Sequence, residues 1–151
     1  MEDSFLKGLF IYPNNRTVIY VKRIIGLPGD AIEIDGTSLR VNGRELRGPE
    51  VQDLGDPLRS QLLADHWAYR ESGDHSAYTV LWNKDATAGK LSLVVPNAQV
   101  FVLGDNRGAS VDSRQFGVVP VADVKAVVRQ VLFSYNRGEG FRWSRLGKTI
   151  E

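Results

Sequence analysis

The chain has 151 residues, a formal net charge of +1 and no cysteine. A chain of this length fits a single domain, residues 1–151, that can bury a sizeable core, and its near-neutral charge gives no support for a nucleic-acid partner. Without cysteine the protein has no disulfide, no thiolate nucleophile and no thiolate-bound metal.

The first third of the chain predicts antiparallel hairpins. Four segments have the alternation or the β-branched content of strands: residues 9–12, 17–25, 31–34 and 38–41. The turn residues Pro13-Asn14-Asn15 separate the first two segments. The pairs Asp35-Gly36 and Asn42-Gly43 favour tight hairpin turns after the next two. Two hairpins in such close succession indicate an antiparallel meander.

The middle of the chain is less regular. Residues 47–76 contain several Gly and Pro residues that break regular structure, and only Leu58–Ala64 could form one short helix. Three strands are expected farther on: residues 77–82, 91–95 and 99–103. Residues 121–135 are ambiguous, because their valines fit both a helical stripe and a strand.

A lysine stands inside the strand that begins the stretch 20–30, Tyr-Val-Lys-Arg-Ile-Ile-Gly-Leu-Pro-Gly-Asp. The β-branched residues favour an extended backbone, and the glycines and proline then force a turn. Lys22 can extend its ammonium group to solvent, or it can be buried without a carboxylate partner. A free lysine has a pKa near ~10.4, and burial can lower that pKa enough to make the amine a general base.

A second distinctive stretch spans residues 104–120 and reads Gly-Asp-Asn-Arg-Gly-Ala-Ser-Val-Asp-Ser-Arg-Gln-Phe-Gly-Val-Val-Pro. Its carboxylates and arginines can satisfy one another and the backbone through charge-assisted hydrogen bonds. The alternative is a surface loop whose charges are solvated. The residues of this stretch alone leave both interpretations open.

Taken together and in this order, the two stretches resemble the bacterial type I signal peptidases. Leu-Arg-Val-Asn-Gly at 39–43 and Phe-Val-Leu at 101–103 are further matches, and the resemblance covers roughly residues 9–135. It implies a mainly β fold of two antiparallel sheets or a partly open barrel, with residues 44–90 as an irregular inserted subdomain. It also favours a short turn and then a strand from about Ala126.

The resemblance implies a Ser/Lys hydrolase in which Lys22 is the general base. Ser110 resembles the serine whose hydroxyl orients that amine. A neutral partner suits such a base, because a carboxylate beside the amine would raise its pKa. Four further residues resemble the support of the site: Asp112 and Arg114 as a structural ion pair, and Asp105 and Asn106 as the scaffold of the loop.

The strand before Lys22 resembles the edge at which the family binds its substrate. Ile19, Tyr20 and Val21 are therefore expected to pair with an extended peptide by β-strand addition. The implied partner is the signal peptide of an exported preprotein, cut after a small-x-small pattern at the periplasmic face of the bacterial inner membrane. No cofactor is implied.

The two histidines do not predict a second site. Sequence neighbours such as Asp74, His75 and Ser76 cannot usually converge on one another as a catalytic triad does. His66 and His75 have no third ligand placed with them, so no metal site is expected.

One feature departs from the family, whose nucleophile lies upstream in a Ser-Met-x-Pro motif that follows a transmembrane anchor. Met1 is the only methionine here, and Ser4, the only serine ahead of Lys22, has neighbours that do not match. No run approaches the ~18 apolar residues of a membrane span. We expect the chain as given to be soluble, to lack the anchor and nucleophile segments, and not to cleave peptides.

Two alternatives to an enzyme of this family stay open. One is a catalytically silent relative, such as a peptide-binding or pilus-assembly protein that kept both stretches. The other is a different Ser/Lys hydrolase on the same β scaffold, such as a self-cleaving repressor.

Overall fold

The computed structural model describes residues 7–11, 19–55, 61–73, 77–85, 89–136 and 140–150, with only the backbone described for residues 7–11 and Asn136. Several expectations fall outside these residues: Ser4, the turn at Pro13-Asn14-Asn15, the start of the helix expected from Leu58, and His75. Within the described ranges, no helix is long and apolar enough to cross a membrane.

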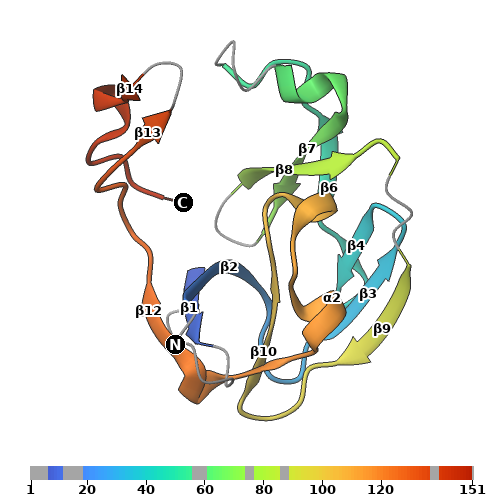
Figure 1. Ribbon diagram of the computed structural model, residues 1–151. Helices are drawn as coiled ribbons and strands as arrows, with labels where there is room; N and C mark the ends of the chain where they lie inside the picture. Colours follow the sequence, from blue (N-terminus) through green and yellow to red (C-terminus); the bar gives the residue numbers. More distant parts are fainter. Residues whose placement is uncertain are drawn as a thin grey trace.

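The described strands form four antiparallel sheets (Figure 1). The largest has the order β11-β10-β2-β1-β12: Val119–Pro120, Gln99–Leu103, Ile19–Gly26, Lys7–Ile11 and Val124–Val127. The second has the order β5-β4-β3-β9: Arg44–Glu45, Ser38–Val41, Ala31–Asp35 and Lys90–Val94. The third is β6-β7-β8: Arg47–Glu50, His66–Ser72 and Ala77–Asn83. Two short strands, β13 (Tyr135–Asn136) and β14 (Gly140–Phe141), form a separate hairpin.

The described helices are short. One α-helical turn, α2, spans Ser113–Phe116. Four 3₁₀ turns accompany it: Gln61–Ala64, Arg107–Ala109, Val121–Asp123 and Trp143–Arg145. The prediction of a mainly β, antiparallel fold is therefore confirmed.

Both predicted hairpin turns are present. Asp35 faces Ser38 across the β3–β4 turn, where Gly36 has φ = +60°. At the β4–β5 turn Asn42 and Gly43 have φ values of +52° and +78°. Positive φ at both central residues is what a two-residue hairpin requires and what Asn-Gly adopts most readily. The meander expected from these turns is thus formed by β3, β4 and β5.

The second half of β2, from Arg23 to Gly26, and the strand β10 from Val100 onward are buried on both faces. One face of the five-stranded sheet packs against the four-stranded sheet and forms the main core: Ile25, Ile32, Ile34, Leu39, Leu46, Val95, Phe101 and Leu103. The opposite face forms a second core from Ile24, Val100, Val102 and Val119. Because successive residues of a strand point to opposite faces, each central strand contributes to both cores. This double burial fixes the two strands that lead to the candidate site.

Residues 44–90 are more regular than the sequence suggested. Strands β6, β7 and β8 form a sheet whose own core contains Tyr78, Val80 and Trp82. Strand β7 reads His-Trp-Ala-Tyr-Arg-Glu-Ser and buries Glu71, so it lacks the apolar alternation that identifies a strand. The described part of the expected helix, Gln61–Ala64, forms a 3₁₀ turn.

The expectation of a strand from about Ala126 is only partly correct. Strand β12 begins at Val124, after the expected turn, and already ends at Val127. It is the outer strand of its sheet and pairs with β1, with Gly8 opposite Val127. Beyond it the chain leaves the sheet, and Figure 1 shows the β13–β14 hairpin standing apart from the other sheets.

Candidate active site

The fold brings Lys22 and Ser110 together. Lys22 lies in the middle of β2, opposite Gly8 of β1. Ser110 lies in the segment Gly104–Arg114, which follows β10 and is called the site loop below. Lys22 Nζ donates a hydrogen bond of 2.5 Å to Ser110 Oγ across 88 residues of sequence. The expected contact is therefore present.

The surroundings of Lys22 favour a neutral amine. Burial lowers the pKa of Lys22 from its ordinary value of 10.5, the charge of Asp112 raises it, and the charge of Arg114 lowers it. Among the described residues, no carboxylate forms an ion pair with Nζ. Lys22 is half-buried, which lies between the two states, exposed or buried, that the sequence left open. The lowered pKa has a clear physical cause, because desolvation penalises the charged form.

Gly104 supports the Lys22–Ser110 pair. A Cβ atom at Gly104 would lie 2.2 Å from Ser110 Oγ and 3.4 Å from Lys22 Nζ, so the pair packs directly on bare backbone. The Gly104 amide donates to Asp112 Oδ2 at 3.0 Å, and its carbonyl accepts from Arg107 Nε at 3.0 Å. Both backbone polar groups of Gly104 are thus fixed by charged side chains.

The expected ion pair between Asp112 and Arg114 is present. Asp112 is fully buried and accepts hydrogen bonds of 2.8 Å from both Nε and Nη2 of Arg114. It also caps α2 by accepting from the Arg114 amide. Burial alone would raise the pKa of Asp112, but the hydrogen bonds from Arg114 and Gly104 outweigh it and hold that pKa below its ordinary value. Asp112 therefore stays charged beneath the site.

Asp105 and Asn106 join the loop to the sheet β6-β7-β8. The Asp105 carbonyl accepts from the Leu81 amide at 2.8 Å, and Asn106 forms a parallel bridge with Leu81. The Asp105 carboxylate accepts from Arg23 Nε and Nη2 at 2.8 and 2.9 Å. Arg23 is buried, and its guanidinium carbon lies 3.4 Å from the centre of the Tyr78 ring. Burial, with the nearby charge of Glu71, raises the pKa of Tyr78.

The sequence analysis missed a buried ion pair at the site. Arg107 Nη1 and Nη2 donate to Glu71 Oε1 and Oε2 at 2.7 and 2.5 Å, and both side chains are fully buried. Arg107 belongs to the second distinctive stretch, whereas Glu71 lies 36 residues earlier in a stretch that looked irregular. Nothing in the spacing of a single sequence pairs these two residues.

The segment Ile19–Val21 is paired on one side only in the described sheet. Its residues face Ile11–Leu9 of β1, whereas β10 pairs with β2 at Arg23, Ile24 and Gly26. Ile19 and Val21 are 53% and 59% exposed. Tyr20 packs against the second core, and Lys22 Nζ lies 5.8 Å from the centre of its ring. Ile19 and Val21 thus place exposed side chains on β2 next to Lys22.

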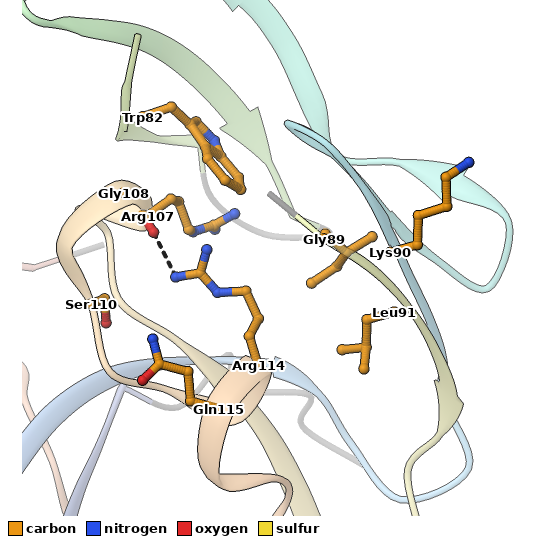
Figure 2. Close-up of a pocket in the computed structure, with 10 residues that line it drawn as sticks. Trp82, Gly89, Lys90, Leu91, Arg107, Gly108, Ser110, Arg114 and Gln115 are labelled. Carbon is orange, nitrogen blue, oxygen red and sulfur yellow. Dashed lines mark hydrogen bonds between the residues drawn. The ribbon is translucent and has the colours of Figure 1, made fainter. Parts of the chain in front are cut away.

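Ser110 also lines a cavity of about 280 Å³ (Figure 2). Lys90, Arg107 and Arg114 line it together with Trp82, and Figure 2 shows the hydrogen bond of 2.6 Å from Arg114 Nη2 to the Arg107 carbonyl. In the ranges that the structure describes, no cluster of three residues could hold a metal ion. The site is therefore built from hydrogen-bonded and charged side chains around one amine and one hydroxyl.

Comparison with known proteins gives a consistent result. Residues 9–133 match the model of a family described as "Signal peptidase, peptidase S26". The signal peptidase I of Bacillus caldolyticus is 36% identical over 127 residues, 84% of this chain and 59% of that protein. The signal peptidase IB of Staphylococcus aureus strain Mu50 is 33% identical over 128 residues, 85% of this chain and 59% of that protein. The chain thus spans about three fifths of the length of these curated relatives.

One solved structure is also similar. It is the crystal structure of a signal peptidase I from Enterococcus faecalis V583, determined at 2.27 Å resolution. The sequences are 27% identical, the match covers 84% of this chain and 97% of that chain, and the TM-score is 0.46.

Proposed function

Because the chain belongs to the signal peptidase family of S26 peptidases, we propose that it carries the base of a Ser/Lys peptidase site that cleaves signal peptides. Lys22 is the general base, and Ser110 is the hydroxyl that orients its amine. The observation that carries this proposal is the 2.5 Å hydrogen bond between Lys22 Nζ and Ser110 Oγ, while no carboxylate in the described ranges forms an ion pair with the amine.

The mechanism is acyl transfer through a serine ester. The neutral amine of Lys22 removes the proton of a serine hydroxyl as that oxygen attacks the scissile carbonyl, and the resulting ammonium then protonates the leaving amine. The lowered pKa of Lys22 supports this role, because a neutral amine is needed to accept the proton. Asp112, Arg114, Asp105 and Asn106 hold the site loop and do not touch the reacting atoms.

The substrate is proposed to add a strand to the exposed segment of β2. Ile19 and Val21 then contact the peptide, and Tyr20 helps to shape the site from the opposite face of the strand. The partner is the signal peptide of an exported preprotein at the outer face of the bacterial inner membrane. We also propose that residues 1–151 form a single domain in which residues 44–90, which follow β4 and end at the first residue of β9, are an insertion.

The nucleophile is proposed to be absent from these 151 residues. The family's Ser-Met-x-Pro motif does not occur in them, and Ser110 is occupied as the partner of Lys22. Loss of the nucleophile removes about 10⁶-fold of the rate in one well-studied serine protease. We therefore expect no measurable cleavage by the chain as given.

The test uses a synthetic signal peptide with a small-x-small cleavage site, followed by mass spectrometry. The 151-residue chain should leave it intact, and the same chain joined to an upstream Ser-Met-x-Pro segment of a relative should cleave it. In the joined chain, Lys22→Ala should abolish cleavage, and Ser110→Ala should slow it about 10²-fold or more. Cleavage by the unextended chain that survives Ser4→Ala would show that the view of the nucleophile is wrong. An inactive joined chain that still binds the peptide would favour the silent peptide-binding protein.

A further inference from the structure

We propose that Glu71, in strand β7, is a positioning residue for the Lys22–Ser110 pair. Through Arg107 it fixes the carbonyl of Gly104, the backbone on which both side chains rest. This role rests on the proposed function, because it matters for chemistry only if Lys22 is the base. It also gives residues 44–90 a function, since Glu71 lies in their sheet.

The first step is the ion pair itself. Glu71 and Arg107 are both fully buried, and two parallel hydrogen bonds join the carboxylate to the guanidinium. A bidentate pair fixes direction as well as distance, because both planar groups must align. Because desolvation offsets the attraction between buried charges, such a pair adds little to stability. We therefore interpret the Glu71–Arg107 pair by the orientation that it gives Arg107.

The second step runs from Arg107 into the site loop. Its Nε donates to the Gly104 carbonyl, and its own carbonyl accepts from Arg114 Nη2 at 2.6 Å. Arg114 in turn binds Asp112, and Asp112 accepts from the Gly104 amide. These four residues form a closed ring of charge-assisted contacts. Among the described residues, Glu71 is the only carboxylate from outside this ring that forms an ion pair with a member of it.

The third step connects Gly104 to the reacting groups. Ser110 Oγ and Lys22 Nζ pack where a side chain on Gly104 would be, at 2.2 and 3.4 Å from its Cβ position. A rotation of this peptide would therefore displace both groups. The charged groups that face the amine are Asp112 and Arg114, both members of the ring. Glu71 reaches the amine only by holding that ring in place.

The same sheet also contacts the loop at several other points, including Asn83 against Gly108 and Trp82 beside Arg114. The Leu81 amide of β8 donates to the Asp105 carbonyl, and Tyr78 stacks on Arg23, which binds the Asp105 carboxylate. Glu71 differs from these contacts because its bidentate partner, Arg107, itself donates to the Gly104 carbonyl. A merely structural role for Glu71 would reduce stability and leave the state of the Lys22 amine unchanged.

The test follows the titration of the Lys22 amine by NMR in protein labelled with ¹⁵N-lysine, with Lys22→Met assigning its signal among the six lysines. The variant Glu71→Gln keeps the size of the side chain and removes the charge that holds Arg107. Burial is the main cause of the lowered pKa of Lys22. Loosening the loop should therefore admit water and raise that pKa towards 10.5. If the pKa of Lys22 in Glu71→Gln is unchanged, or is lower than in the unaltered protein, the positioning role is overturned.

Two further variants separate positioning from general destabilisation. Val80→Ala leaves a cavity in the same sheet without touching the ion pair, and it should leave the titration of Lys22 unchanged. An equal rise in Val80→Ala would overturn the proposal. If Glu71→Gln does not fold, the double variant E71L/R107M is used for the same titration. An apolar pair of similar size can replace a buried ion pair without loss of stability. The double variant removes the bond to the Gly104 carbonyl and should also raise the pKa of Lys22.

The outcome for Glu71 is distinct from the outcome for the proposed function. If Lys22 in the unaltered protein titrates like an ordinary lysine, the base assignment fails whatever Glu71 does. If Lys22 titrates low and Glu71→Gln does not change it, the base assignment stands and the positioning role of Glu71 fails.

Discussion

The two sides of strand β2 hold neighbouring cations in opposite ways. On one side Arg23 is buried, forms two hydrogen bonds to the Asp105 carboxylate and stacks on Tyr78. On the other side the Lys22 amine donates to the neutral hydroxyl of Ser110 and forms no ion pair with a carboxylate of the described residues. Both partners come from the same site loop, five residues apart in the sequence.

The difference shows how one strand can use two neighbouring cations in different ways, Arg23 for structure and Lys22 for chemistry. A guanidinium does not lose its proton in proteins, so a carboxylate partner yields a permanent contact that anchors the loop. An amine can become neutral, but only where burial is not compensated by a carboxylate. The placement of Asp105 and Ser110 therefore determines which cation anchors and which can accept a proton.

The largest effect is expected from breaking the support that both sides share. Asp112→Asn removes the charge that binds Arg114 and leaves one acceptor oxygen where Arg114 and the Gly104 amide now share two. Removing one partner of a buried ion pair lowers the free energy of unfolding by about 3–5 kcal/mol. Because Arg114 is partly exposed, we expect a loss of about 3 kcal/mol for this variant. Urea unfolding at pH 7 measures the loss, with Asp123→Asn as the control. A loss below about 1 kcal/mol would contradict this view of the loop.

The pH dependence of the same variant provides a second check. The folded pKa of Asp112 is lowered, so its stabilising contribution is present above its ordinary value of 3.8 and is lost as the pH falls through the folded pKa. The unaltered protein and Asp112→Asn should therefore differ most at neutral pH and converge in acid.

The second prediction makes the Lys22 side resemble the Arg23 side. Ser110→Asp places a carboxylate at the position that now holds the hydroxyl. An opposite charge within a few ångströms shifts a pKa by roughly 1–3 units towards the charged form. The pKa of Lys22 should rise, as measured by NMR titration, and the joined chain should lose cleavage at neutral pH. Ser110→Ala is the control, because it removes the hydrogen bond without adding charge.

The third prediction concerns the Arg23 side alone. Asp105→Asn leaves a buried guanidinium with a neutral partner, and the half-exposed position of Asp105 limits the cost to about 1–2 kcal/mol. The titration of Lys22 should not change, because the two cations leave β2 on opposite faces. A large shift in that titration would mean that the two sides are not independent.

The smallest effect is expected for Lys22→Met. A lowered folded pKa means that the unfolded chain binds more protons than the folded chain between that pKa and 10.5. Protonated Lys22 therefore costs stability below its folded pKa, and this cost is relieved as the pH rises towards 10.5. Lys22→Met should be equal to or slightly more stable than the unaltered protein at pH 7, by less than about 1 kcal/mol, and the difference should shrink in alkali. A clear destabilisation by Lys22→Met at pH 7 would argue against a desolvated amine.

Local features were predictable from the sequence. The turns at Asp35-Gly36 and Asn42-Gly43 follow from backbone preferences of adjacent residues, and both are present. The Asp112–Arg114 pair joins residues two positions apart, so the match of the loop to a known family was enough to anticipate it. The contact between Lys22 and Ser110 was anticipated in the same way, although 88 residues separate them.

Features that depend on distant partners were not predictable. Arg23 and Asp105 are 82 residues apart, and Glu71 and Arg107 are 36 apart. Strand β7 buries its glutamate because Arg107 neutralises it, and no residue near Glu71 in the sequence reveals that partner. Strand β12 likewise takes its limits from pairing with β1, which valine content alone could not supply.

The separation of Lys22 from Ser110 also has a consequence for the newly made chain. Synthesis runs from the N-terminus, so Lys22 leaves the ribosome well before the 88 residues that end at Ser110. Until β10 pairs with β2, the amine is solvated and behaves as an ordinary lysine. Pairings over such long separations close late in folding. The general base proposed here therefore acquires its lowered pKa only in the last steps of folding. In an incomplete chain the amine of Lys22 stays protonated at neutral pH.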